Sequence, residues 1–237
     1  MNFVNHYIKP WAIYLVLSLV IIAFGTIVLA STEKVDFHLC LNSLHSDFQD
    51  PFFRYFTHLG DGYFVTFAGI ALVAITWKKE GIQPFVLGAS ALLTCGAVVQ
   101  FLKHTVFHDA LRPSKFIVDQ PLYLVPGLEM NGFHSFPSGH TAAAFTFWAF
   151  VAYSFGRNNI WVQVLCVIIA TLVGYSRIYL SQHFLEDVVA GAPEPVVGYH
   201  VGQALKYLLR AWHKQNASED LQKAVWYLNR AIARLNS

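Results

Sequence analysis

An uncharged apolar run near the N-terminus sets the strongest constraint on the fold of this chain. Residues 11–30 contain no Asp, Glu, Lys or Arg, and about 20 such residues form a helix long enough to cross the hydrocarbon core of a bilayer. A cleaved signal peptide is the alternative, because Val28-Leu29-Ala30 resembles a cleavage site. The run is longer than the usual apolar core of a signal peptide, so an uncleaved membrane span is favoured.

The whole chain has the composition of a polytopic membrane protein. Hydrophobic residues make up 55% of it and charged residues 13%, with a mean hydropathy of +0.45, whereas about a quarter of the residues in a soluble domain are charged. The formal net charge is +2 and the basic residues are scattered, which argues against nucleic-acid binding. The three cysteines lack metal-ligand spacing, and no metal or cofactor is expected.

Hydrophobic segments separated by polar turns predict an all-α bundle of about six membrane spans. Segment 31–61 is expected to lie along the membrane interface, and 104–136 forms the longest loop. Pro193-Glu194-Pro195 interrupts the sixth span, which is kinked or does not cross, because a proline in a helix interior costs about 3 kcal/mol. The predicted spans cover about residues 11–30, 63–77, 82–101, 141–155, 160–175 and a sixth from residue 184.

A change of composition after Trp212 divides the chain into a membrane domain over 1–212 and a tail over 213–237. Ser218 is the predicted N-cap of an amphipathic helix in the tail. Natural packing on the cytoplasmic side is favoured, and an engineered replacement of the natural C-terminus is the alternative. The apolar residues that recur at helical spacing are Leu221, Ala224, Val225, Leu228, Ala231, Ile232 and Leu235.

Loop charges predict the orientation of the spans. Basic residues near the ends of spans favour the cytoplasm, and they gather on one side, whereas loop 31–61 on the other side is acidic. Both termini are therefore expected inside, and the opposite side faces the periplasm or the outer surface. The basic residues of the inner side are Lys9, Lys78, Lys79, Arg157, Lys206, Arg210 and Lys214.

Three short clusters on the outer side supply what a metal-free site for a phosphoryl group requires. Together they hold three cations, two histidines, one carboxylate and a Ser-Gly pair at the start of a helix. The clusters are Lys103 with Arg112-Pro113, then Pro137-Ser138-Gly139-His140, then Ser176-Arg177 with His183 and Asp187.

His183 and Asp187 are four residues apart, so on a helix they share a face. The carboxylate would then accept a hydrogen bond from one imidazole nitrogen and leave the other as a nucleophile. A lone pair of this kind is more often a surface or capping contact. Arg177, expected in the turn after the fifth span, changes the balance because an arginine grips two phosphate oxygens at once.

Pro137-Ser138-Gly139-His140 stands at the expected start of a helix, whose free backbone donors and dipole attract an anion. Ser138 is expected to donate its hydroxyl, and Gly139 to let the backbone come close to a ligand. His140 is a candidate general acid for a departing alkoxide. An ordinary serine N-cap beside a solvated histidine is the alternative.

Together the clusters resemble the three motifs of the type 2 phosphatidic acid phosphatase superfamily, which includes bacterial lipid phosphatases, glucose-6-phosphatase and soluble vanadium haloperoxidases. The resemblance covers about residues 60–192, with the second and third motifs complete. The first motif departs from the pattern, because eight residues separate Lys103 from Arg112 where six are usual. Either the loop bulges or Lys103 is displaced, and either cation alone is also compatible with an interfacial position.

The resemblance implies a membrane phosphatase domain over 1–212 that works without metal or cofactor. His183 would attack phosphorus to form a phosphohistidine, Asp187 would orient it, and His140 would protonate the leaving oxygen. Water would then hydrolyse the intermediate. The phosphate oxygens would be bound by Lys103, Arg112, Ser138, Gly139 and Arg177.

The expected substrate is a lipid whose phosphate lies at headgroup level in a bacterial inner membrane: phosphatidic acid, phosphatidylglycerol phosphate, an isoprenyl phosphate or diphosphate, or lipid A. Hydrolysis and phosphate transfer use the same intermediate and stay open, as does the oligomeric state. The alternative is a non-enzymatic scaffold that binds lipid phosphate, suggested by the stretched first motif and the interrupted sixth span. Candidate headgroup contacts, with a solvated loop as the alternative, are His108, Asp109, Glu129 and His134.

Overall fold

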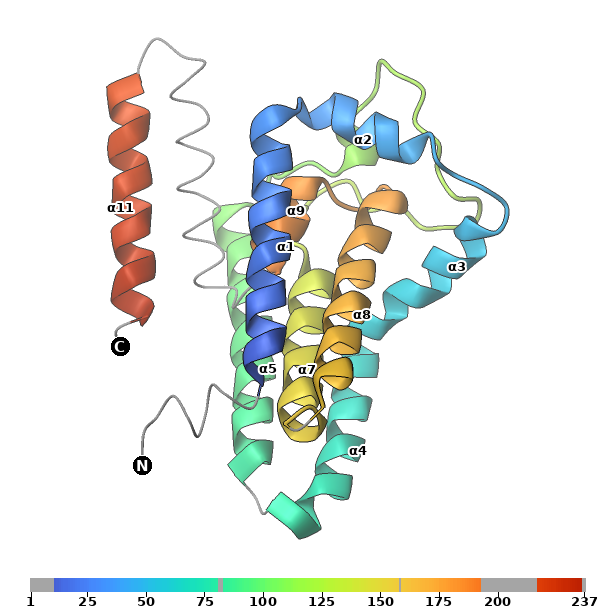
Figure 1. Ribbon diagram of the computed structural model, residues 1–237. Helices are drawn as coiled ribbons and strands as arrows, with labels where there is room; N and C mark the ends of the chain where they lie inside the picture. The colour runs from blue at the N-terminus through green and yellow to red at the C-terminus, as the bar shows by residue number, and fades with distance from the viewer. Residues whose placement is uncertain (1–10, 81–82, 158, 193–216, 236–237) are drawn as a thin grey trace.

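The computed structural model describes residues 11–80, 83–157, 159–192 and 217–235, and all regular structure in these ranges is helical (Figure 1). The predicted all-α fold is therefore confirmed. In chain order the elements are α1 (Ala12–Ser31), α2 (Lys34–Asn42), α3 (Gln49–Phe56), η3 (Thr57–Gly60), α4 (Gly62–Glu80), α5 (Gln83–Phe101), η4 (Leu102–Val106), α6 (Pro113–Phe116), α7 (Gly139–Phe155), α8 (Ile160–Tyr179), α9 (Leu185–Gly191) and α11 (Ala217–Leu235).

Helix α7 lies inside the bundle and packs against α8, α5, α4 and η3 (Figure 1). The residues with 0% exposure in this core include small ones, Ala144 and Ala152 of α7 and Val173 of α8. Small side chains let membrane helices approach each other closely. The Tyr14 hydroxyl of α1 donates to the backbone carbonyl of Phe145 at 2.7 Å, so the first span is tied to the same core.

Two of the described helices, α1 and α8, are long and apolar enough to cross a membrane. The segments Gln49–Gly60 and Gly62–Thr76, which meet at a bend of 55°, add a third span if they act as one. The count of six spans is not confirmed, although α4, α5 and α7 lie where the second to fourth spans were expected. Of the predicted sixth span only α9 is described, and Pro193-Glu194-Pro195 lies outside the described residues.

Helix α8 ends at Tyr179, four residues beyond the predicted end of the fifth span. Arg177 therefore lies in the last turn of the helix, and the prediction that it lies in the following turn is wrong. The helix continues because its polar residues have partners inside the protein. Ser176 Oγ donates to the Val173 carbonyl at 2.6 Å, and Arg177 Nη1 donates to Thr57 Oγ1 at 2.9 Å.

The two ends of the bundle differ (Figure 1). The predicted interfacial segment forms α2, which lies across one end, and α3, which slopes down the side. The same end carries the loop between η4 and α7, the last turn of α8 and the start of α9. The C-terminal ends of α4 and α7 lie at the opposite end. All three motif clusters thus lie at one end of the molecule, as expected from the predicted order of the spans.

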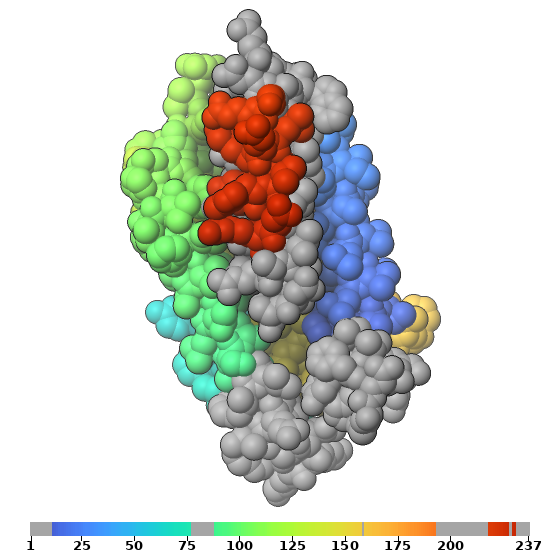
Figure 2. Space-filling view, turned by 90° about the vertical axis from the view of Figure 1, so that its left-hand side faces the viewer, coloured from blue at the N-terminus to red at the C-terminus, as the bar shows by residue number. Residues whose placement is uncertain are grey.

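The predicted amphipathic helix of the tail is present as α11, on the side of the bundle that carries α1 and α5 (Figure 2). It begins at Ala217, so Ser218 lies inside the helix and its assignment as N-cap is wrong. Asp220 and Ala224 are buried, whereas Leu221 is 43% exposed. The buried face therefore coincides with the predicted apolar stripe at Ala224 but not at Leu221. The predicted domain boundary at residue 212 lies outside the described residues.

Candidate active site

Side chains from all three motifs surround His183, which lies in the turn between α8 and α9. Its ring is buried, and Lys103, Arg177 and Arg112 are close enough to act on its charge. Burial and these three cations hold the pKa of His183 well below its ordinary value. The imidazole is therefore neutral at pH 7, the state in which a ring nitrogen can attack an electrophile.

His183 and Asp187 form a buried pair, with 3.3 Å between Nδ1 and Oδ2. The prediction that both lie on one helix is wrong, because α9 begins at Leu185 and His183 precedes it. The contact forms instead because Asp187 lies in the first turn of α9 and folds back over the start of the helix. Its Oδ2 accepts from the backbone N–H of Phe184 at 2.9 Å, a capping contact that also fixes the carboxylate beside the ring.

Ser135 is a member of the site that sequence reasoning missed. It is 1% exposed, and its hydroxyl donates to Asp187 Oδ2 at 2.5 Å while lying 3.5 Å from His183 Nδ1. Its backbone N–H donates to the Ala110 carbonyl at 3.0 Å. The only signal in the sequence is its place two residues before Pro137, at the start of the second motif.

The long spacing of the first motif coincides with the π-turn η4. In this turn the Phe107 N–H donates to the Leu102 carbonyl at 2.8 Å, five residues back, so the helix takes up extra backbone. Lys103 remains buried, and its Nζ donates to the His134 carbonyl at 3.0 Å. Its Cε lies 3.8 Å from the position of a Cβ on Gly139. Of the two alternatives, the geometry agrees with the bulged loop, because Lys103 still reaches the other motifs.

Arg112 immediately precedes α6 and points into the protein. Its Nε donates to the Phe133 carbonyl at 3.0 Å, and its Nη1 donates to the side chain and the carbonyl of Gln182 at 2.7 and 3.3 Å. Burial lowers the pKa of this guanidinium, and the charge of Asp187 opposes that shift. Gln182, which the motif reasoning passed over, thus ties the first motif to the turn that carries His183.

Arg177 is buried in the last turn of α8, where Thr57 of η3 accepts one of its N–H groups. Its Nε is buried and has no hydrogen-bond partner within the described part of the chain. A buried charged donor without a partner is costly, so an unpaired guanidinium N–H beside other cations fits a site that binds an anion. Thr57 lies in the segment expected at the membrane interface and carries no motif that would mark it.

His140 lies in the first turn of α7, where its side chain is 29% exposed, and faces Asp61. The distance from His140 Nε2 to Asp61 Oδ2 is 3.6 Å. Asp61 directly follows η3, and a Cβ on Gly60 would lie 2.5 Å from the His140 carbonyl oxygen. Only glycine allows this close approach of η3 to α7. The Gly-Asp pair ahead of the second span is the signal that sequence reasoning left unused.

Ser138 is the N-cap of α7, as the alternative for this motif expected. Its Oγ accepts from the backbone N–H of Thr141 at 3.4 Å and from Thr141 Oγ1 at 2.8 Å. Its own N–H donates to the Asp187 carbonyl at 2.9 Å, which joins the second motif to the third. A Cβ on Gly139 would meet two side chains at 3.5 and 3.8 Å, so packing alone does not require glycine there.

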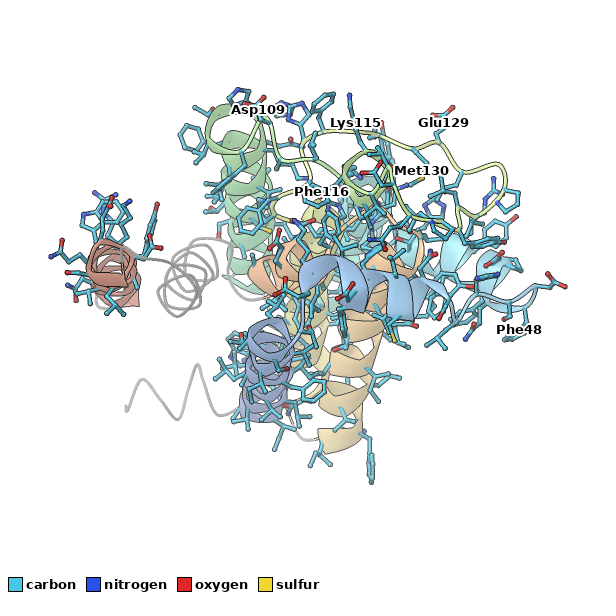
Figure 3. The ribbon with its side chains drawn as sticks, turned by 90° about the horizontal axis from the view of Figure 1, so that it is seen from above. Phe48, Asp109, Lys115, Phe116, Glu129 and Met130 are labelled. Atoms are coloured by element: carbon cyan, nitrogen blue, oxygen red, sulfur yellow. The ribbon has the colours of Figure 1, made fainter. Side chains whose placement is uncertain are left out.

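The candidate headgroup residues divide into two groups. His108 and Asp109 pair with each other at 2.9 Å and are 60% and 83% exposed, as a solvated loop predicts. Asp109 and Glu129 project outward from the loop above the bundle (Figure 3). His134 differs, because its Nδ1 lies 3.1 Å from the Lys103 carbonyl and its own carbonyl accepts from Lys103. It therefore supports the first motif.

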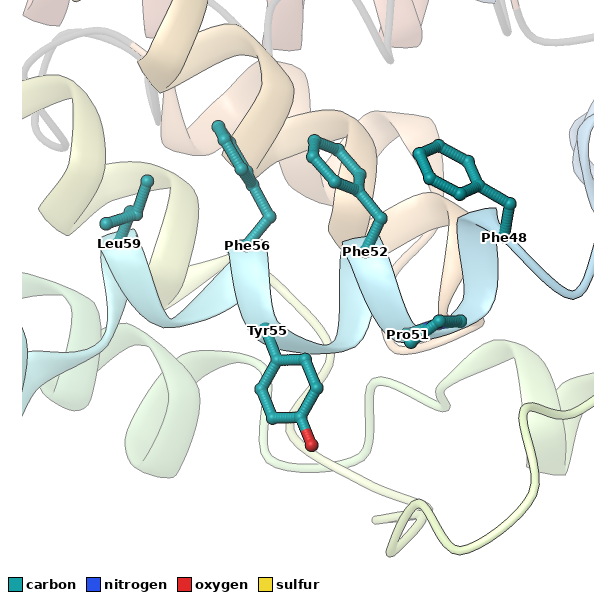
Figure 4. Close-up of a pocket in the computed structure, with 6 residues that line it drawn as sticks. All are labelled: Phe48, Pro51, Phe52, Tyr55, Phe56 and Leu59. Carbon is teal, nitrogen blue, oxygen red and sulfur yellow. The ribbon is translucent and has the colours of Figure 1, made fainter.

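A hollow of about 510 Å³ lies on the outer face of α3 and η3, and it contains no motif residue (Figure 4). The opposite face of these elements carries Thr57, the partner of Arg177. In the described residues no three His, Cys, Asp or Glu side chains are grouped as metal ligands. The hollow is lined by Phe48, Pro51, Phe52, Tyr55, Phe56 and Leu59.

The sequence of this chain is similar to those of lipid phosphatases. It is 29% identical to a lipid A 4'-phosphatase of Bacteroides thetaiotaomicron over 65% of this chain and 68% of that protein. The crystal structure of Aquifex aeolicus LpxE is similar, with a TM-score of 0.56 and 29% identity over 71% of this chain and 93% of the other. Both likenesses agree with the predicted class of enzyme.

A second solved structure shows how far the fold extends. The PAP2-type phosphatidylglycerolphosphate phosphatase of Bacillus subtilis has a TM-score of 0.58 over 88% of this chain and 99% of its own, with 21% identity. The model of the PAP2 superfamily matches residues 85–214, more than half of the chain and all three motif clusters. The chain therefore belongs to the PAP2 superfamily.

Proposed function

We propose that this chain removes phosphate from a monoester or diphosphate on a membrane lipid, without a metal, through a phosphohistidine on His183. The setting of His183 carries the proposal. Its buried neutral ring contacts Asp187 and lies among Lys103, Arg112 and Arg177. A protein that only binds lipid phosphate would not need a buried nucleophile beside its anion site.

The order of events follows from which atoms face each other. Nδ1 of His183 is turned toward Asp187, so Nε2 is the nitrogen that attacks phosphorus. As the P–N bond forms, the P–O bond to the lipid breaks, and His140 gives a proton to the departing oxygen. Water then attacks phosphorus and returns a proton to His140, the P–N bond breaks, and inorganic phosphate leaves with His183 regenerated.

Stabilisation of the phosphoryl oxygens is assigned to the cations and the start of α7. Arg177 offers its unpaired Nε–H, and the first backbone N–H groups of α7, at Gly139 and His140, have no partner within a helix. Ser138 caps this helix, and we assign those N–H groups to the phosphoryl oxygens. In a desolvated site such donors stabilise the charge that develops in the transition state.

The substrate class follows from the position of the site and from one relative. The site lies at one end of a bundle of apolar helices, where a lipid phosphate meets the membrane surface. The name of the Bacteroides relative specifies lipid A, which favours a lipid A phosphate ahead of phosphatidic acid, phosphatidylglycerol phosphate and isoprenyl phosphates. The basic residues Lys78, Lys79 and Arg157 follow or end the helices at the opposite end of the bundle. Because basic residues favour the cytoplasm, we assign this site to the periplasmic side of a bacterial inner membrane.

The non-enzymatic scaffold is the second candidate, and its motivation was the stretched first motif together with the interrupted sixth span. The π-turn η4 weakens the first reason, because it keeps Lys103 buried among the site residues. A binder would hold lipid phosphate without turnover, so release of inorganic phosphate distinguishes the two candidates.

The deciding experiment measures phosphate release by the purified protein in detergent with EDTA present. The substrates are lipid A, phosphatidic acid, phosphatidylglycerol phosphate and undecaprenyl diphosphate, and the variants are His183→Ala and the exposed control His108→Ala. The proposal expects release that survives EDTA, persists in His108→Ala and is lost in His183→Ala. Binding without release by folded protein would support the scaffold, and a strict need for metal would rule out the mechanism.

A further inference from the structure

Ser181, two residues before His183, has an unusual backbone for its residue type. Its φ is +51°, the left-handed region that favours glycine, and its side chain is fully buried. The residue belongs to none of the three motifs. A buried serine held in this conformation must have contacts that hold it there, because the turn would otherwise relax toward another backbone conformation.

Those contacts come from α2. The Ser181 hydroxyl accepts from Asn42 Nδ2 at 3.2 Å and lies 3.2 Å from His38 Nε2. His38 and Asn42 are four residues apart on one face of α2, and both are buried. Two buried side chains from one helix thus meet a single hydroxyl in the nucleophile turn.

Both α2 side chains are themselves fixed. The amide of Asn42 donates to the Tyr123 carbonyl and accepts from the Tyr123 N–H, each at 2.8 Å, which settles which way the amide points. The ring of His38 packs edge-on against Phe184, with 5.2 Å between centroids. Burial lowers the pKa of His38 to about 4, so its contact with Ser181 joins two neutral groups.

We infer that His38, Asn42 and Ser181 are positioning residues that hold the turn between α8 and α9, and with it the reacting nitrogen of His183. The inference rests on the proposed function, because it assumes that His183 is the nucleophile. His38 contacts the turn on both sides of that residue, at Ser181 before it and at Phe184 after it.

The turn also has inner support, which makes the part played by α2 separable. The N–H groups of Gln182 and His183 both donate to the Arg177 carbonyl, at 3.0 and 3.1 Å. These bonds fix where the backbone passes, whereas the α2 contacts set the conformation of Ser181. A nucleophile displaced by about 1 Å loses about a hundredfold in rate, so a loosened turn is expected to lower kcat more than it raises KM.

The test compares Ser181→Ala, Ser181→Gly, Asn42→Ala and the double variant Asn42→Ala/Ser181→Ala, with Ser43→Ala as the matched control. Ser43 is an exposed serine at the end of α2 whose hydroxyl donates to the Cys40 carbonyl at 2.8 Å. Steady-state kcat and KM for lipid phosphate and the thermal unfolding midpoint are measured for each. We expect kcat to fall about tenfold in Ser181→Ala and in Asn42→Ala with KM within about twofold, and Ser43→Ala to match wild type.

The double variant and the glycine variant separate positioning from simple stabilisation. Because both alanine changes remove the same Asn42–Ser181 hydrogen bond, the double variant is expected to lose little more kcat than the worse single variant. Ser181→Gly removes the left-handed cost, so its unfolding midpoint is expected to exceed that of Ser181→Ala while its kcat stays low. Wild-type kcat in Ser181→Gly, or additive losses in the double variant, would overturn the inference.

Failure of the proposed function would look different from failure of this inference. If wild-type protein releases no phosphate, or if His183→Ala retains turnover, the nucleophile is wrongly assigned and the inference falls with it. If His183→Ala is inactive while every Ser181 and Asn42 variant keeps wild-type kcat, the proposed function stands and only the role of α2 is refuted.

Discussion

Two regions build the candidate site, and they differ in how their residues could be found. Residues 137–187 hold two compact motifs, which lie together at one end of the bundle. Segment 31–61 contributes single contacts instead, such as Thr57 to Arg177 and Asn42 to Ser181. The comparison teaches that groups assigned to the phosphate are marked by residue type and spacing, whereas the groups that hold them are set by tertiary packing alone.

The largest effect is expected in the motif region, from Asp187→Asn. The change keeps the shape of the side chain but removes the charge that holds the His183 ring and supports it as it becomes positive. We expect kcat to fall about 10³-fold or more, as in other carboxylate–histidine pairs. The neighbouring Glu186→Gln, which breaks the partly buried ion pair with Lys34, is the control and should stay within a few-fold. More than a tenth of wild-type kcat in Asp187→Asn would contradict the assignment.

In segment 31–61, the largest effect is expected from Asp61→Asn. Asp61 lies 3.6 Å from His140, where its carboxylate can orient the imidazole that we assign as general acid. We expect kcat for a lipid monoester to fall about 10- to 100-fold. The loss should be much smaller for p-nitrophenyl phosphate, whose leaving group needs little protonation. Equal losses on both substrates would show that Asp61 only caps α4, where it accepts from the Tyr63 N–H at 2.8 Å.

A smaller effect is expected from Thr57→Val, which removes the acceptor of Arg177 Nη1. Loss of a hydrogen bond to a charged group costs about 1.5–3 kcal/mol, but phosphate can take over part of the contact. We therefore expect KM to rise about three- to tenfold with kcat within about threefold. Thr66→Val, on the exposed face of α4 where the hydroxyl bonds its own helix at 2.7 Å, should have no effect. An unchanged KM would remove Thr57 from the site.

The smallest effect concerns pH. The pKa of His183 is held well below its ordinary value by burial and by Lys103, Arg177 and Arg112, so the neutral form persists as the pH falls. Between pH 7.5 and 5.5 we expect the contribution of His183 to change kcat less than about twofold, whereas a nucleophile with an ordinary pKa near 6.5 would lose about nine-tenths of its neutral fraction. A kcat that falls about tenfold over this range in the wild type would contradict the depressed pKa.

Much of this architecture is predictable from the sequence, because long apolar segments and local motifs both leave short-range patterns. The positions of α1, α4, α5, α7 and α8 and the gathering of the three motifs at one end followed from hydropathy and loop order. The predicted helix ends failed at Arg177 and His183, where contacts inside the protein, rather than local composition, decide where a helix ends or begins. Arg177 stays helical because Thr57 pairs with it inside the protein, and His183 lies in a turn because Asp187 caps the helix that follows.

The supporting residues could not be predicted, because nothing local marks them. Ser135 donates to Asp187 across 52 residues of sequence, and Asn42 contacts Ser181 across 139. Such pairs depend on how helices pack, which a single sequence does not encode in any short pattern. The π-turn η4, which keeps Lys103 in the site, could not be predicted either. The sequence is equally compatible with a displaced lysine, and only the backbone of η4 decides between the two.

The central claim is a covalent phosphoryl group on His183, and trapping it is the most direct test. Protein mixed with a lipid substrate carrying labelled phosphate is quenched with alkali during turnover, and the labelled peptide is identified by mass spectrometry. The account predicts label on His183 that resists alkali and is lost in acid, as expected for a phosphorus–nitrogen bond, and no label in His183→Ala or after a chase with unlabelled substrate. Turnover without any bound label under these conditions, or label on another residue, would contradict it.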